Sequence, residues 1–374
     1  MKRPHILIAV GARPNFMKAA PLIRALRKTR RAKVTLVHTG QHYDPDLSAV
    51  FFRDLKLPPP RINLRAGSGS HSAQTAAILQ RFEPVLEKLR PDAVVVVGDV
   101  NSTLACALAA WKMPYRPWVV HVEAGLRSFD RSMPEEANRK LTDHLADLLF
   151  APSPDAVANL RREGIPARRI FFAGNVMIDS LRAVQGRARS SRALQRLGLR
   201  PRQYALVTLH RPSNVDDPKA ARPIVSALRR LSQRLPVVFP LHPRTRKLWR
   251  RNGLLGALQR LPGILLTPPM GYLDFACLLS HARLVLTDSG GIQEETTILK
   301  VPCLTLRRST ERPVTITHGT NRLVGGAAAE ILRACRTVLK TGRAKSRIPA
   351  RWDGHAADRI ARVLLRHCGT LSKK

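Results

Sequence analysis

The order of apolar runs and helical patterns predicts an α/β fold built on two parallel sheets. Short β-rich runs alternate with helical patterns along the chain, as expected where helices cover both faces of a parallel sheet. The 374 residues, of which 44% are hydrophobic, are enough for two domains with their own cores. A polar, basic segment at 182–202 separates two series of runs. We therefore expect two Rossmann-like domains facing each other across a cleft, at 1–175 and 176–350, followed by a terminal segment at 351–374.

The predicted strands are the short apolar runs that end in polar or glycine-containing clusters. In the first series they are His5–Val10, Lys33–Thr39, Ala93–Val97, Trp118–Val122, Leu149–Ala151 and Ile170–Ala173. In the second series they are Tyr204–Leu209, Val237–Pro240, Gly263–Leu266, Leu284–Thr287 and Pro302–Leu306. Helical patterns lie between them, for example at Pro14–Arg30 and Ala73–Leu89, and an amphipathic pattern from Gly354 to Cys368 predicts a terminal helix.

The composition restricts the class of protein. A formal charge of +38 is compatible with basic residues spread over solvated surfaces or with a nucleic-acid or anionic-membrane surface. Aromatic residues make up only 5%, and no basic run is interleaved with them, which argues against a single-strand binder. The five cysteines are scattered, so we expect buried thiols in a reducing cytoplasm and neither disulfides nor a metal site. The first apolar run is too short for a signal peptide, and no run reaches transmembrane length, so we expect no membrane insertion.

Acidic residues follow two predicted strands and open the next helix. Asp99 comes after the run at 93–97, Glu123 comes after the run at 118–122, and Glu135 and Glu136 follow. Parallel strands present such residues at their carboxyl ends, where open α/β sheets bind ligands. Several carboxylates in one crevice indicate proton transfer. The alternative is structural: Asp99 caps a helix, and Glu135 pairs with an arginine one turn later.

The turn after the first strand, GARPNFMKAAPL, combines glycine with basic residues. Gly11 permits a tight turn, and Arg13 and Lys18 flank the start of a helix, where backbone amides favour anions. The dinucleotide-binding pattern Gly-x-Gly-x-x-Gly is absent. A second glycine-rich stretch, GSGSHSAQT at 67–75, is interpreted as a flexible loop, with phosphate contact as the alternative.

The motif LVLTDSGGIQEETTIL gives the strongest binding signal of the second series. We expect a strand, a short loop and a helix that starts near Ile292, with Ser289 as its cap. Gly290 and Gly291 allow a diphosphate to approach the helix N-terminus, and Glu295 can accept hydrogen bonds from ribose hydroxyls. The alternative is an ordinary capping box with Glu295 on a solvated face.

Three further residues of the second series have both a functional and a structural interpretation. His210 ends a strand and either stabilises a leaving group or is a polar terminus. His242 lies in a basic stretch that is either a binding or an ordinary surface. Phe275 either stacks on a base or belongs to the core, and Arg312 lies in a loop after a strand.

Seven motifs, in order between about residues 5 and 326, resemble the non-hydrolysing branch of the UDP-N-acetylglucosamine 2-epimerase family. They are GARPNFMKAAPL, TGQHYD, VGDVNSTL, HVEAGLRS, PEEANR, TDSGGIQEE and ERP…GTNRLVG. The resemblance implies a glycosyltransferase-B architecture with UDP bound by the second domain and residues 351–374 forming a helix that returns to the first. It implies a UDP-sugar substrate and no cofactor, and we expect a homodimer.

The chemistry implied by the resemblance has two stages. Loss of the C2 proton accompanies departure of UDP and leaves a 2-acetamidoglucal; UDP adds back after C2 is reprotonated on the opposite face. The acid/base residues would be Asp99, Glu123 and Glu135, and His210 would assist the departing diphosphate. The residues that would bind the UDP-sugar are Arg13, Lys18, Arg139, Phe275, Ser289, Gly290, Gly291, Glu295 and Arg312.

Departures from the family pattern bear on regulation and substrate. Some members bind a second UDP-sugar as an activator, and Gln41, Gln74, Glu136 and His242 match that site, but Asp44 and Ala73 replace two of its polar groups. We therefore expect no requirement for an activator. TGQHYDPDLS, GSGSHSAQT and LHRPSNVD also resemble relatives that act on UDP-2,3-diacetamido-glucuronate. That substrate, a hydrolysing epimerase and a basic nucleic-acid or surface-binding protein stay open as alternatives.

Overall fold

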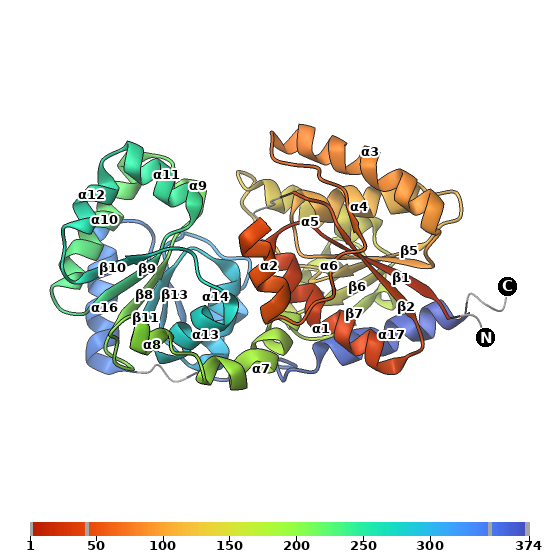
Figure 1. Ribbon diagram of the computed structural model, residues 1–374. Coiled ribbons are helices and arrows are strands. Elements are labelled where there is room, and N and C mark those ends of the chain that lie inside the picture. Colours follow the sequence, from red (N-terminus) through yellow and green to blue (C-terminus); the bar gives the residue numbers. More distant parts are fainter. Residues whose placement is uncertain (1–2, 42–44, 343–345, 371–374) are drawn as a thin grey trace. The chain divides into compact units, whose positions relative to one another are not determined.

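The computed structural model describes residues 3–41, 45–342 and 346–370. It divides into two compact units, one formed by 1–183 with 350–374 and the other by 184–349. Each unit contains one parallel sheet with helices (Figure 1). The predicted α/β class with two parallel sheets is therefore confirmed, whereas the functional role of each predicted domain stays a prediction.

Unit 1 contains a seven-stranded sheet in the order β3-β2-β1-β4-β5-β6-β7, and every pairing described in it is parallel. Its central strands are fully buried because valine and isoleucine side chains point to helices on both faces. The strands are β1 (His5–Val10), β2 (Lys33–His38), β3 (Ile62–Asn63), β4 (Ala93–Val97), β5 (Trp118–Val122), β6 (Leu148–Ala151) and β7 (Ile170–Phe172).

The helices of unit 1 include the terminal one, which packs against α1 (Figure 1). Asp179 fixes the start of that helix: its carboxylate accepts hydrogen bonds from the amides of Ala356 (3.2 Å) and Ala357 (2.7 Å). The predicted return of the terminal segment to the first unit is thus confirmed. The helices are α1 (Arg13–Thr29), α2 (Pro45–Asp54), α3 (His71–Leu89), α4 (Asn101–Lys112), α5 (Pro134–Leu145), α6 (Pro154–Arg162), η1 (Ala167–Arg169) and α17 (Ala356–Thr370), and α7 (Val176–Arg189) begins in this unit and ends in the other.

Unit 2 contains a six-stranded parallel sheet in the order β10-β9-β8-β11-β12-β13. Its strands are β8 (Ala205–Thr208), β9 (Val237–Pro240), β10 (Ile264–Thr267), β11 (Leu284–Thr287), β12 (Cys303–Thr305) and β13 (Asn321–Leu323). Its helices are α8 (Ala193–Arg196), α9 (Pro212–Val215), α10 (Pro218–Ser232), α11 (Pro243–Arg251), α12 (Leu254–Gln259), α13 (Tyr272–His281), α14 (Gly290–Leu299), α15 (Val314–Thr317) and α16 (Ala328–Thr341).

The chain order of the strands reverses in the same way in both sheets. The reversal lies between β1 and β4 in unit 1 and between β8 and β11 in unit 2. Helices that leave neighbouring strands on opposite faces open a crevice at this point, and open α/β sheets bind ligands there, outside the carboxyl ends of the strands. Residues that follow β1, β4, β8 and β11 are therefore candidates for a ligand-binding site.

Some local predictions differ from the structure. The strands β3 and β13 have two and three residues, too few for a periodic signal, and were not predicted. The stretch at 67–75 is only partly a loop, because Ser70 accepts a hydrogen bond from Ala73 N (3.2 Å) and α3 begins at His71. Asp44 lies outside the described residues.

The cysteine side chains and the helices bear on two predictions made from the composition. All five cysteine side chains are buried, as predicted for unreactive thiols. In the part of the chain that is described, no helix combines the length and hydropathy that a membrane span requires.

We predict that two glycines with nearly the same backbone conformation differ sharply in their tolerance of alanine. Gly125 has φ +83°, and a Cβ there would lie 2.3 Å from the carbonyl oxygen of Ala156; Gly164 has φ +81° and open space around it. Gly164→Ala should lower the free energy of unfolding by about 1–2 kcal/mol, the cost of a left-handed backbone. Gly125→Ala should cost about 1–3 kcal/mol more, because rigid backbone must move. Urea unfolding followed by circular dichroism measures both, and equal effects would contradict this account.

Candidate active site

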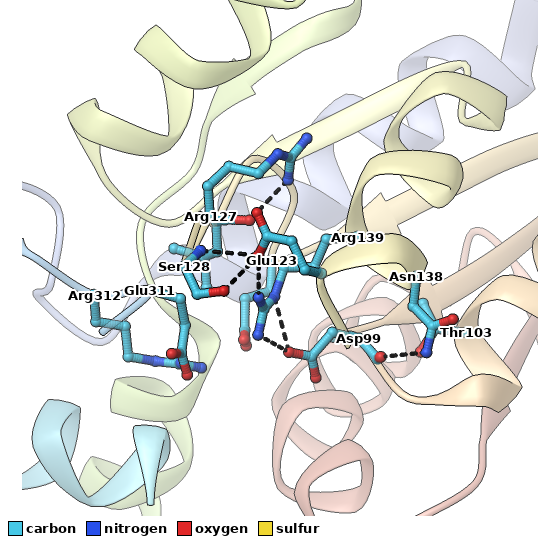
Figure 2. A network of polar contacts seen from close by, with 12 residues as sticks. Asp99, Thr103, Glu123, Arg127, Ser128, Asn138, Arg139, Glu311 and Arg312 are labelled. Atoms are coloured by element: carbon cyan, nitrogen blue, oxygen red, sulfur yellow. Dashed lines mark hydrogen bonds and ion pairs between the residues drawn. The ribbon is translucent and has the colours of Figure 1, made fainter. Parts of the chain in front are cut away.

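Asp99 lies at the carboxyl end of β4 and is held by an arginine from α5. Arg139 donates to Asp99 Oδ2 from Nε (3.0 Å) and Nη2 (2.7 Å), and Asn138 Nδ2 donates to the Asp99 carbonyl (3.0 Å) (Figure 2). The Asp99 side chain is 21% exposed, so it remains accessible while its orientation is fixed. The N-cap residue of α4 is Val100, so the structural alternative of Asp99 as the cap is wrong.

Glu123 lies at the end of β5 and pairs with Lys18 from α1. The Lys18 ammonium is 2.9 Å from Oε1 and 2.8 Å from Oε2, and both side chains are almost completely buried. Glu123 has φ +75°, a left-handed conformation that costs a non-glycine residue about 1–3 kcal/mol. Gly98 makes room for the pair, since a Cβ there would lie 2.6 Å from Lys18 Nζ. The β5 terminus is thus strained and locked by a buried ion pair.

The turn between β1 and α1 is organised by Asn15. Its Oδ1 accepts hydrogen bonds from the amides of Gly11 and Ala12 (both 3.0 Å), and its Nδ2 donates to the Val97 carbonyl (2.8 Å). A Cβ on Gly11 would lie 2.0 Å from Ser102 Oγ, so glycine is required here for close packing. The described side chains do not include that of Arg13.

Two adjacent glutamates at the start of α5 have different environments. Glu136 accepts hydrogen bonds from Ser128 N (2.9 Å), Ser128 Oγ (2.7 Å) and Arg139 Nη1 (2.8 Å). Burial raises the pKa of Glu136, but these hydrogen bonds and the Arg139 charge outweigh burial and leave the pKa below its usual value. Glu135 is half-buried, and among the described residues its carboxylate has no hydrogen-bond or ion-pair partner. The structural alternative, in which Glu135 pairs with Arg139, is therefore wrong, and Glu135 is the less constrained of the two glutamates.

The two glutamines considered for a second ligand are engaged inside unit 1. Gln41 Oε1 accepts hydrogen bonds from Ser102 N (3.0 Å) and Ser102 Oγ (2.6 Å). Gln74 Nε2 donates to the Gln41 carbonyl (3.1 Å), and its Oε1 accepts from Asn101 Nδ2 (2.9 Å). Both residues are buried, so they hold the β2 and β4 termini together.

In unit 2 the strand-end histidine is oriented by an aspartate. His210 Nδ1 is 3.0 Å from Asp288 Oδ1, and Asp288 also accepts hydrogen bonds from Arg211 N (2.9 Å) and Asn214 Nδ2 (3.1 Å). Burial raises the pKa of Asp288, but the His210 charge and these hydrogen bonds lower it to about 2. The His210 side chain is 42% exposed. The His242 ring lies 5.7 Å from the His210 ring, and its Nδ1 accepts from Arg244 N (3.3 Å) at the start of α11.

The start of α14 differs from the predicted cap. The helix begins at Gly290, two residues before the predicted start, and Ser289 occupies the N-cap position without a side-chain hydrogen bond to the helix. The Ser289 amide donates to Thr287 Oγ1 (3.0 Å), and the Ser289 hydroxyl does not cap the first helical amides. A Cβ on Gly290 would lie 2.4 Å from Arg312 Nη1, so only glycine fits. A helix N-terminus of this kind is suited to an anion.

Glu295, one turn into α14, is buried and not solvated, so the capping-box alternative is wrong. Its Oε1 accepts a hydrogen bond from the hydroxyl of Tyr272 in α13 (2.6 Å). Burial raises the pKa of Glu295 to about 7, with Glu294 adding to the rise and the Tyr272 hydrogen bond opposing it. Phe275, on the same helix as Tyr272, is half-buried against the core.

Arg312 is buried among acidic side chains. Its Nε donates to Glu294 Oε1 (2.6 Å), and its Nη1 pairs with Glu311. The Arg312 and Glu311 side chains are the groups that a Cβ at position 290 would meet. Across the described ranges, no three histidine, cysteine or acidic side chains are grouped in a way that could hold a metal ion.

Comparison with known proteins identifies the family. The sequence profile of the family described as UDP-N-acetylglucosamine 2-epimerase matches residues 24–365. This chain belongs to the UDP-N-acetylglucosamine 2-epimerase family. A UDP-N-acetylglucosamine 2-epimerase from Methanocaldococcus jannaschii is 42% identical over 96% of this chain and 98% of its own length. A UDP-2,3-diacetamido-2,3-dideoxy-D-glucuronate 2-epimerase from Pseudomonas aeruginosa is also 42% identical, over 96% of this chain and 99% of its own length.

Solved structures of the UDP-N-acetylglucosamine 2-epimerase family match as well. The crystal structure of the M. jannaschii enzyme in complex with UDP-GlcNAc and UDP has a TM-score of 0.91 at 42% identity, covering 97% of this chain and 99% of that one. The Neisseria meningitidis UDP-GlcNAc 2-epimerase bound to UDP-GlcNAc has a TM-score of 0.89 at 30% identity, covering 97% and 100%. The resemblance inferred from the seven motifs is thereby confirmed, and the neighbours share the glycosyltransferase-B-like fold.

Sequence reasoning missed the residues that hold the candidate groups of this epimerase-family site. They are Asn15, Ser128, Asn138, Tyr272 and Asp288. Asp288 could have been found from the sequence, because it directly follows β11, the buried strand that pairs with β8 at the reversal of the strand order. The other four depend on contacts between elements distant in sequence.

We predict that Glu295 makes the stability of this epimerase-family protein pH-dependent. The folded-state pKa of about 7 lies above the ordinary value, so the folded protein keeps a proton that the unfolded chain loses. The free energy of unfolding should therefore fall as pH rises from about 4.5 to about 7, by roughly 3 kcal/mol. Urea titrations should show this decline reduced in Glu295→Gln. In Tyr272→Phe the decline should extend above pH 7, because the opposing hydrogen bond is lost. Superimposable pH profiles for all three proteins would contradict the assignment.

Proposed function

We propose that the protein epimerises C2 of a UDP-linked N-acetyl sugar, interconverting UDP-GlcNAc and UDP-ManNAc. The observation that carries the proposal is the pair of strand-end carboxylates, Asp99 and Glu123. Each is fixed by a cation, and both lie beside the reversal of the strand order in unit 1. Family membership and relatives that act on UDP-N-acetylglucosamine support the same substrate class. No cofactor is invoked, because proton transfer and departure of a diphosphate need none.

The proposed reaction balances as an elimination followed by an addition. A carboxylate removes the C2 proton while the bond from C1 to the UDP oxygen breaks, giving 2-acetamidoglucal and UDP. An acid on the opposite face then protonates C2, and UDP adds back to C1. Asp99, Glu123 and Glu135 form the acid/base set. Asp99 and Glu123 are held in place, as general acid/base catalysis requires, and Glu135 has no competing partner among the residues that the structure describes.

UDP is proposed to bind at unit 2. The amides at Gly290 and Gly291, uncapped by Ser289, suit the diphosphate, and Glu295 suits ribose hydroxyls. Phe275 is proposed to contact uracil. His210, kept in one orientation by Asp288, would donate to the departing phosphate oxygen. Arg13, Lys18, Arg139 and Arg312 keep their proposed roles as phosphate or sugar ligands.

A second substrate has a specific observation in its favour. The P. aeruginosa relative, named as a UDP-2,3-diacetamido-2,3-dideoxy-D-glucuronate 2-epimerase, is as similar to this chain as the M. jannaschii relative is. A uronate would also suit a chain with a formal charge of +38. The hydrolysing alternative would use the same groups and differ only in releasing free sugar.

The assembly and the location of the protein are also proposals. A homodimer is supported by two large exposed apolar side chains in unit 1, Trp111 on α4 and Leu141 on α5, which are packed helices. Binding of a specific nucleic acid is not expected. A cytoplasmic location fits a UDP-sugar substrate and buried thiols.

We predict that the product formed in deuterated water carries deuterium at C2 and stays joined to UDP. The assay follows UDP-N-acetylglucosamine and its 3-acetamido uronate analogue separately by proton NMR, so it also identifies the better substrate. Free sugar and UDP as the only products would establish the hydrolysing alternative. Product that retains hydrogen at C2 would rule out the proton-transfer mechanism.

We predict that the carboxylates of the acid/base set are each essential for turnover. Asp99→Asn, Glu123→Gln and Glu135→Gln should lower kcat by roughly two to four orders of magnitude, the range for a positioned acid or base. Glu136→Gln is the matched control for Glu135→Gln, since the two residues are adjacent on α5. It should affect turnover less, because Glu136 serves Ser128 and Arg139. If Glu136→Gln were inactive and Glu135→Gln normal, the assignment would be reversed.

A further inference from the structure

A buried ion network in unit 1 lies outside the groups assigned to the reaction. It consists of His121 on β5, Asp143 on α5, Arg127 in the loop after β5, and Glu163 after α6; we call it the His121 network. The side chains of His121, Asp143 and Arg127 are completely buried, and that of Glu163 is 21% exposed. Burying charges is costly unless their partners are well arranged, so such a network calls for a specific role.

The geometry of His121 determines its protonation. Its Nε2 is 2.8 Å from the carbonyl oxygen of Gly98, which can only accept a hydrogen bond. Its Nδ1 is 2.6 Å from Asp143 Oδ1. Asp143 is also an acceptor, because its Oδ2 accepts a hydrogen bond from Gly125 N (3.1 Å) and lies 2.7 Å from the Arg127 guanidinium. Both ring nitrogens must therefore donate, which makes His121 an imidazolium cation.

The two hydrogen bonds of His121 reach the two turns that carry candidate catalytic carboxylates. Gly98 directly precedes Asp99, and its amide donates to the Val122 carbonyl (3.0 Å), next to Glu123. On the other side, Asp143 Oδ2 accepts from the amide of Gly125 (3.1 Å), two residues after Glu123. The His121 network thus joins the turn after β4 to the turn after β5.

We propose that His121 is a positioning residue of the epimerisation: as a cation it fixes the turns that present Asp99 and Glu123. This inference rests on the proposed function. A displacement of catalytic groups by about 1 Å typically costs a hundredfold in rate. Loss of His121 should therefore lower kcat about a hundredfold and leave KM and the affinity for UDP within a few-fold of wild type, because the amides proposed for the diphosphate and the groups proposed for ribose and uracil, at Gly290, Gly291, Glu295 and Phe275, belong to unit 2.

Three variants separate positioning from general stability. His121→Asn removes the bridge. Asp143→Asn keeps the shape but removes the charge, so His121 can become neutral and still donate from Nε2 to Gly98; its kcat should lie between those of wild type and His121→Asn. The matched control is His5→Asn, which changes another buried histidine of the same sheet, at the start of β1, where Nε2 contacts Thr35 Oγ1 (2.8 Å).

The test combines turnover, thermal stability and NMR. Nitrogen-15 NMR of the wild-type protein at pH 7.5 should show protons on both ring nitrogens of His121, although a free imidazole is largely neutral at that pH. A neutral ring, or equal kcat for His121→Asn and His5→Asn, would overturn the proposal. If His121→Asn fails to fold, Asp143→Asn and the NMR result still decide. A wild-type protein that exchanges no deuterium into either sugar would refute the proposed function instead, and the NMR result would remain a test of the cation.

Discussion

The buried ion pair between Lys18 and Glu123 is the interaction on which the arrangement of unit 1 depends. It joins α1 to the end of β5 across a separation of 105 residues and lies beside the chain reversal of the sheet. Removing one partner of such a pair typically costs about 3–5 kcal/mol, because the other charge stays buried and unpaired. Glu123 has a left-handed backbone conformation, which costs a non-glycine residue roughly 1–3 kcal/mol. The pair thus ties a strained strand end to α1.

The neighbouring groups follow from this constraint. Gly98 has φ +71°, which favours glycine, and a Cβ there would displace the Lys18 ammonium from its present position. Glycine makes the backbone of this turn flexible, and the hydrogen bond between His121 and the Gly98 carbonyl restricts it again. Asp99, the next residue, is fixed from the other side by Arg139. Each carboxylate is thus held before a substrate arrives, and this preorganisation is what electrostatic catalysis requires.

Unit 2 also places an aspartate after the strand at its chain reversal, but there the aspartate orients another candidate group. In unit 1 carboxylates are oriented by cations, whereas in unit 2 a histidine that follows β8 is oriented by Asp288, which follows β11. Carboxylates suit a reaction that removes and returns a proton, and a histidine beside an uncapped helix N-terminus suits a leaving diphosphate. The common fold explains why both sets occur at chain reversals, and the different residues explain why the roles differ.

Much of this arrangement could be predicted from sequence. The strands, the acidic residues that follow β4 and β5, and the glycines that begin α14 were evident because parallel strands and helix termini have local signatures. The partners were not evident. One alternative paired Arg139 with Glu135, but Arg139 binds Asp99 and Glu136. One alternative placed Glu295 in solvent, but Glu295 is buried against Tyr272. Such choices depend on contacts between distant elements, which no local pattern encodes. Ser289 shows the same limit, because Thr287 binds its amide and no side chain caps the helix.

The most direct test of the central claim is a double-mutant cycle on the Lys18–Glu123 pair. The free energy of unfolding is measured in urea for wild type, Lys18→Met, Glu123→Gln and the double variant. Each single change leaves a buried partner without its counter-charge, so the account predicts that the double variant is more stable than the sum of the single effects implies, by at least about 2 kcal/mol. Additivity within about 0.5 kcal/mol would show that the pair does not hold the strand end and would contradict the account.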